Sequence, residues 1–112
     1  MKYSGCIIEE SLKDKSILDE FDIVETREDS YIVEIDASQV EEIVLKLQNA
    51  MVSDPCWYCD LKSYDYHYII YNDKIFKVNR DYGEQYEEAK SYGLKRGIQE
   101  EYLPNKSWAK QE

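Results

Sequence analysis

Cys56 to Asn79 reads CWYCDLKSYDYHYIIYNDKIFKVN. It contains three runs rich in aromatic and β-branched residues, separated by polar clusters, which is typical of neighbouring antiparallel strands. Between the second and third runs, Asn72-Asp73 favours a two-residue turn that tolerates positive φ. The stretch therefore predicts two consecutive hairpins, with strands at Cys56–Lys62, Tyr66–Tyr71 and Lys74–Asn79.

The register of the first hairpin decides which side chains share a face of the sheet. A two-residue loop, Tyr64-Asp65, would place the charges of Asp60 and Lys62 on the same face as Phe76, and burying charges among apolar groups is costly. A three-residue loop, Ser63–Asp65, moves both charges to the other face, because a slip of one residue reverses every side chain. We therefore expect the three-residue loop.

With this register, Asp60, Tyr68 and Lys77 form a row across three strands, opposite the face that carries Cys59, Ile69 and Phe76. A carboxylate, a phenol and an ammonium side by side could orient a polar ligand or move a proton, although such cross-strand groups are also ordinary stabilisers of a sheet. No catalytic residue is assigned. The candidate residues for binding a ligand or partner are Tyr58, Asp60, Tyr66, Tyr68, Lys77 and His67.

The segments before this stretch predict further strands and one clear helix. A strand at Tyr3–Glu9 contains Gly5, which indicates a close approach of another backbone. Ser11–Phe21 is a short helix or turn, and Asp22–Arg27 pairs with Tyr31–Asp36 as a hairpin. The helix runs over Ser38–Met51, with Ser38 and Glu41 as a capping box and an apolar stripe at Val40, Ile43, Val44, Leu47 and Met51.

A last helix follows the hairpins. Asp81 and Glu84 are expected to cap its start, and Gly97 to end it with Ile98 packed behind. Its apolar face contains Tyr82, Tyr86, Ala89 and Gly93. Residues 104–112 show little pattern and are expected to fray, although Tyr102, Leu103 and Trp108 could dock.

This order, β(α)ββαβββα, predicts a single α+β domain over residues 1–112. We expect two layers: a mainly antiparallel sheet of about five to six strands, and two main helices on one of its faces.

The cysteines match C-x-x-C at Cys56 and Cys59, and Cys6 with His67 could complete a Cys₃His zinc set. Side chains three apart on a strand point to opposite faces, which opposes a shared metal. A redox motif needs its cysteines at a helix N-terminus, whereas these precede a hairpin. We expect structural cysteines, no metal and no cofactor. His67, a lone histidine at the edge of an apolar face, is more typical of a core residue than of a base or ligand.

The chain has 24 acidic and 14 basic residues, a net charge of −10. Scattered basic residues do not form the cluster that duplex binding needs, so we expect neither direct nucleic-acid binding nor attachment to an anionic membrane. The acidity fits solubility, a basic protein partner, or mimicry of nucleic acid. Neither a run of about 20 apolar residues nor a secretory signal is present, so we expect a cytoplasmic protein.

Three blocks carry a resemblance: YSGCIIEESL, WYCDLKSYDYHYIIYNDKIFKVNR and EQYEEAKSYGLKRGI. Together they resemble a group of short, acidic bacterial and archaeal proteins with the pattern I-I-E-E-S-L, W-Y-x-D-[FL]-K, H-Y-I-I-[FY] and Y-G-x-x-x-G-I. The resemblance implies no activity, cofactor or partner. The stretch between Ile23 and Ile35 is short for the group, and Cys56 and Cys59 fall at its variable positions.

Three functions remain open. The first is an interaction or regulatory module, binding a protein partner or a second copy through a tyrosine-rich face, since tyrosine suits interfaces. The second is a small-molecule-binding protein or enzyme using Asp60, Tyr68, Lys77 and His67, which an apolar pocket reaching His67 would favour. The third is an acidic, phage-type inhibitor that mimics nucleic acid. Binding is favoured over catalysis.

Overall fold

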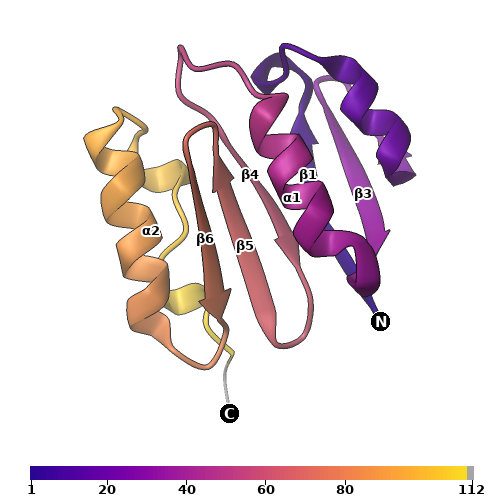
Figure 1. Cartoon of the computed structure of the whole chain (residues 1–112). Helices are drawn as coiled ribbons and strands as arrows, with labels where there is room; N and C mark the ends of the chain where they lie inside the picture. The colour runs from indigo at the N-terminus through magenta and orange to yellow at the C-terminus, as the bar shows by residue number, and fades with distance from the viewer. Residues whose placement is uncertain (111–112) are drawn as a thin grey trace.

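The structure is a computed structural model, and it describes residues 1–110. An antiparallel sheet has the strand order β2-β3-β1-β4-β5-β6 (Figure 1). The strands are β1 (Lys2–Ile8), β2 (Asp22–Thr26), β3 (Ser30–Asp36), β4 (Tyr58–Lys62), β5 (Tyr66–Tyr71) and β6 (Lys74–Asn79), and the α-helices are α1 (Val40–Asn49) and α2 (Gly83–Lys95). The predicted α+β class is confirmed. Within residues 1–110, no helix combines the length and apolar character needed to cross a membrane.

The expected placement of both helices on one face is wrong. Successive side chains of a strand point to opposite faces, and on β5 Tyr68 and Ile70 belong to the core beneath α1. Their neighbours Ile69 and Tyr71 pack instead with Tyr86 and Ala89 of α2. The helices therefore cover opposite faces, α1 over the middle of the sheet and α2 at its β6 end (Figure 1).

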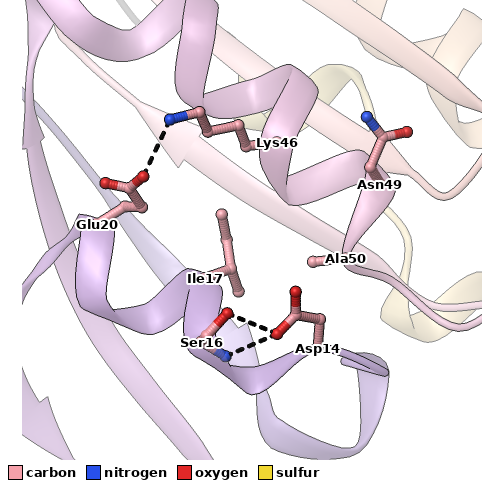
Figure 2. Close-up of a pocket in the computed structure, with 7 residues that line it drawn as sticks. All are labelled: Asp14, Ser16, Ile17, Glu20, Lys46, Asn49 and Ala50. Carbon is pink, nitrogen blue, oxygen red and sulfur yellow. Dashed lines mark hydrogen bonds and ion pairs between the residues drawn. The ribbon is translucent and has the colours of Figure 1, made fainter.

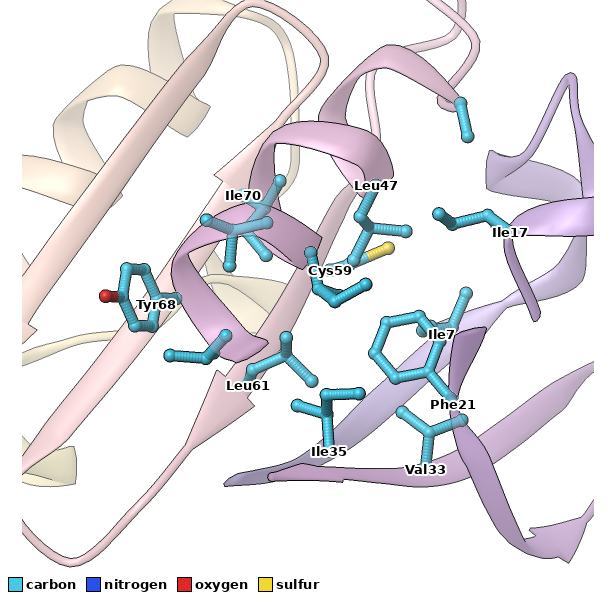
Figure 3. Packing of buried hydrophobic residues seen from close by; sticks show 14 of the residues in the cluster. Ile7, Ile17, Phe21, Val33, Ile35, Leu47, Cys59, Leu61, Tyr68 and Ile70 are labelled. Carbon is cyan, nitrogen blue, oxygen red and sulfur yellow. The ribbon is translucent and has the colours of Figure 1, made fainter. Parts of the chain in front are cut away.

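The larger core lies between α1 and the sheet (Figure 3). The predicted helical stripe is confirmed: Val40, Ile43, Val44, Leu47 and Met51 are all buried. The capping box is not formed, because the Asp36 carboxylate accepts the Ser38 N–H at 2.9 Å and starts a 3₁₀ turn, Ala37–Gln39, before α1. An Asp side chain bonded two residues ahead is a common way to open such a turn.

The register predicted for the first hairpin is also wrong. Lys62 pairs with His67 and Asp60 pairs with Ile69, while Ile69 pairs with Phe76 as expected. Asp60 and Phe76 therefore share a face, and the row Asp60, Tyr68, Lys77 does not exist. The Ser63 N–H donates to the Tyr66 carbonyl at 2.8 Å, which closes a loop at Tyr64-Asp65. The Asn72-Asp73 turn is confirmed, with neither residue at positive φ.

The short helix or turn expected at Ser11–Phe21 is present as a 3₁₀ helix at Lys15–Glu20, and another 3₁₀ segment, Glu9–Ser11, precedes it. Gly5 makes the predicted close approach: a Cβ built on it would lie 1.7 Å from the Asp60 carbonyl oxygen of β4. Here only glycine lets the two backbones come together.

α2 begins without the expected Asp81 cap, since its N-cap is Tyr82 and makes no side-chain capping bond. Tyr82 itself is exposed, whereas Tyr86, Ala89 and Gly93 are buried as predicted. The helix end is confirmed: Gly97 has φ +91°, and the Ile98 N–H returns to the Gly93 carbonyl at 3.0 Å. This is the arrangement that favours glycine after a helix.

The segment after α2 returns across the face that this helix covers. Leu103 is buried against Gly93, and the Lys110 N–H donates to the Arg80 carbonyl at 2.7 Å. Trp108 docks, whereas the Tyr102 side chain is largely exposed. Residues 104–110 thus pack on the domain, which the weak sequence pattern does not indicate, and residues 111–112 of the expected frayed tail lie outside the described residues.

Candidate functional site

The six candidate binding residues divide between the two faces of the sheet. Tyr66, Tyr68 and Lys77 lie on the face that α1 covers, and Tyr58, Asp60 and His67 lie on the α2 face. The structure therefore does not bring the six together as a single tyrosine-rich surface. Each group of three has its own environment.

In the α1-face group, Tyr68 belongs to the core and Tyr66 and Lys77 lie beside it. The Lys77 ammonium lies 4.6 Å from the ring centroid of Tyr66 and 5.7 Å from that of Tyr68. Tyr68 is 4% exposed, packs 5.6 Å from the Tyr3 ring, and has its pKa raised by burial. A lysine over partly buried aromatic rings is a common stabilising arrangement, so this group has a structural explanation.

The α2-face group is built around His67, which is 2% exposed. Its Nε2 lies 2.6 Å from Asp60 Oδ2, and its Nδ1 lies 2.9 Å from the Tyr86 hydroxyl. The Trp108 ring stacks on the imidazole at 5.8 Å between centroids. With Nε2–H donating to the carboxylate, Nδ1 accepts the Tyr86 proton, and both ring nitrogens are satisfied.

This Asp60-His67-Tyr86 chain resembles a catalytic relay in composition but not in exposure. The terminal hydroxyl, on Tyr86, is fully buried, and burial raises its pKa against the opposing influence of Arg80. A nucleophile or general acid must reach a substrate atom. These hydrogen bonds can instead hold the Asp60 carboxylate in one orientation, because a buried histidine that is itself hydrogen-bonded fixes the direction of the carboxylate.

Replacing Tyr86 by phenylalanine tests this arrangement. The ring stays in the core, but Nδ1 of the buried His67 loses its partner, and an unsatisfied buried polar atom costs about 1–3 kcal/mol. Chemical denaturation should show a loss of that size in the free energy of unfolding. Tyr82→Phe, at the exposed start of the same helix, should change it by less than about 0.5 kcal/mol; equal small changes in both variants would contradict the network.

A groove of about 690 Å³ opens beside this network, where α2 no longer covers the sheet. The side chains of Cys6, Ile8, Tyr58 and Asp60, from β1 and β4, line the sheet side of the groove. One wall is the segment after α2, with Ile98, Gln99 and Tyr102, and the loop at Pro55–Trp57 closes one end. The Tyr58 hydroxyl donates to the Tyr102 carbonyl and ties that wall to β4.

A second hollow, of about 400 Å³, is lined by Asp60, Lys62, His67 and Trp108. Asp60 therefore lines both hollows. Its side chain is 24% exposed, so the face that the sequence reasoning treats as closed is open at this residue. Because this part of the face is open to solvent, Asp60 and the exposed Lys62 can lie on the same face as the buried Ile69 and still keep their charges in contact with water.

The cysteines lie on opposite faces of the sheet. Cys59 is buried under α1, where burial raises the pKa of its thiol to about 12. Cys56 and Cys6 line the groove instead, and burial also raises the pKa of Cys56. Within residues 1–110 no group of three or more histidine, cysteine and carboxylate side chains could hold a metal ion. The two groove thiols serve as convenient chemical reporters.

A smaller hollow, of about 310 Å³, lies between α1 and the Lys15–Glu20 3₁₀ helix (Figure 2). Its polar groups already bond one another: Lys46 pairs with Glu20 at 3.0 Å, and Asp14 accepts the Ser16 N–H at 3.0 Å. Groups satisfied in this way offer little to a ligand. The groove beside Asp60 is therefore the better candidate site.

Sequence reasoning identifies Tyr58 and Asp60 in the groove, and His67 in the second hollow, but misses the other lining residues of the groove. Cys6, Ile98, Gln99 and Tyr102 are distant from β4 in sequence and meet it only through the fold. No family model, curated protein or solved structure matches the chain. The function is therefore inferred from the geometry of the site.

Proposed function

We propose that the chain is a binding protein that holds a small molecule with an apolar body in the groove between β1, β4 and the segment after α2. The observation that carries this proposal is the groove itself, about 690 Å³ in volume and lined mainly by apolar and aromatic side chains. Small-molecule sites are typically hollows of about 300–1,000 Å³ with a few placed polar groups.

Binding is favoured over catalysis because the hydrogen-bonded series Asp60, His67, Tyr86 beside the groove ends in the buried hydroxyl of Tyr86. A small molecule is favoured over a protein partner because the six candidate residues form no continuous exposed face. Specific protein interfaces bury about 800 Å² on each partner. Of the three functions open from the sequence, the small-molecule-binding protein fits the groove best.

Indole, a neutral aromatic molecule, is a suitable probe of this groove. We expect a titration followed by NMR to shift the amide signals of Cys6, Tyr58 and Ile98. We also expect bound indole to slow alkylation of Cys6 and Cys56 by iodoacetamide, since both thiols line the groove. Cys59 is 1% exposed and should stay unreactive in both conditions.

A groove-filling variant makes the test specific. Cys6→Phe places a ring in the groove and should abolish the shifts and the protection of Cys56. Ser4→Phe, on the same strand and the same face but outside the lining residues, should leave both intact. Indole at millimolar concentration producing neither shifts nor protection in the unchanged chain would refute the proposed function.

A further inference from the structure

Charge is distributed very unevenly in the groove. Ten residues line it, all within the described part of the chain, and among them Asp60 alone carries a formal charge. Arg96 lies close enough to influence the Cys56 thiol at the far end, but its guanidinium bonds Asp73 at 2.7 Å and Asn72 at 3.3 Å. The groove therefore presents one negative group in apolar surroundings.

That negative group is held in place from behind. His67 Nε2 contacts Asp60 Oδ2, and this imidazole is itself fixed by Tyr86 and stacked under Trp108. The paired oxygen is directed to His67, and the carboxylate remains partly exposed where the two hollows meet. A rigid carboxylate in partly water-excluded surroundings favours a cation, because charge attraction strengthens as the effective dielectric falls.

Three aromatic side chains also line the groove. Trp57, Tyr58 and Tyr102 line it together with Asp60. Rings of this kind attract cations through the negative potential of their faces, and they accept the alkyl groups that an organic cation carries. A carboxylate with several aromatic rings is a combination suited to an alkylated ammonium ion.

We propose that the ligand of this groove is a small organic ammonium compound, with its charged nitrogen at Asp60 and its apolar body against the aromatic residues. This inference rests on the proposed function and adds the chemical class of the ligand. The proposed function requires only that a small molecule binds, whereas this inference requires that the ligand carries a positive charge. The two can therefore be tested separately.

The test compares 2-phenylethylamine, which is protonated at neutral pH, with 2-phenylethanol, a neutral molecule of nearly the same shape. Dissociation constants from NMR titration should be about fivefold lower for the amine, the factor that corresponds to one partly exposed ion pair. Asp60→Asn should abolish this preference while the alcohol still binds. Asp65→Asn makes the same chemical change in the β4–β5 turn, outside the groove, and should leave the preference intact.

The outcomes separate the two proposals. Equal affinity for amine and alcohol in the unchanged chain, with both blocked by Cys6→Phe, would overturn the ammonium class and leave the binding function standing. An amine preference that survives Asp60→Asn would also overturn it, since the charge would then be recognised elsewhere. If neither probe binds and neither protects Cys6 or Cys56, both proposals fail. Circular dichroism of each variant confirms that it is folded.

Discussion

Gly5→Ala should destabilise the fold by about 3 kcal/mol or more, toward the upper end of what overpacking causes. The added methyl group would lie 1.7 Å from the Asp60 carbonyl oxygen and 3.2 Å from the Leu61 Cα. Both are backbone atoms of a paired strand, so no side-chain rotation can relieve the clash. Domains of this size are stable by about 5–15 kcal/mol, so this loss is a large share of the total.

Urea denaturation of the two proteins measures this loss as the difference between their free energies of unfolding. Ser4→Ala is the matched control, because Ser4 is the exposed neighbour of Gly5 on β1. It should change the free energy of unfolding by less than about 0.5 kcal/mol. If Gly5→Ala also falls within that range, β1 and β4 do not approach as closely as the structure indicates. The groove residues Cys6 and Asp60 would then lie farther apart.

The sequence is informative where one local pattern decides the outcome. β5 and β6 have the predicted ends, because alternation and the Asn72-Asp73 turn fix them without reference to the rest of the chain. The buried stripe of α1 is likewise a property of one segment. The predicted capping residues of both helices are wrong, because Asp36 caps a 3₁₀ turn ahead of α1 and no side chain makes a capping bond at the start of α2.

The register error has a different origin. The predicted register rests on a sheet with a single buried face, on which the charges of Asp60 and Lys62 could not lie. His67, Tyr68, Ile69, Ile70 and Tyr71 are in fact all buried, because α1 covers one face of β5 and α2 the other. A nearly continuous apolar run is typical of a strand buried on both sides, and HYIIY in β5 carries that signal.

The groove could not have been predicted from any local pattern. It exists because α2 covers the β6 end of its face and leaves β4 and β1 open, while the chain beyond Gly97 returns to form a wall. Ile98, Gln99 and Tyr102 acquire their role from that return. Asp60 was identified as a candidate, but its partner is His67 on the neighbouring strand, not Tyr68.

Leu47→Ala should lower the free energy of unfolding by about 2–5 kcal/mol, through lost transfer energy and the cavity left behind. Leu47 is fully buried at the centre of the α1 core, near Ile7, Cys59 and Ile70 (Figure 3). Leu45→Ala, on the same helix, is the control, because Leu45 is 56% exposed. Its loss in free energy of unfolding should be below about 0.5 kcal/mol. Both substitutions replace leucine by a better helix former, so helix propensity cannot explain a difference between them. Urea denaturation measures both losses. A Leu47→Ala loss as small as that of the control would mean that α1 does not pack on this face of the sheet. The sheet would then be stabilised by α2 alone of the two α-helices.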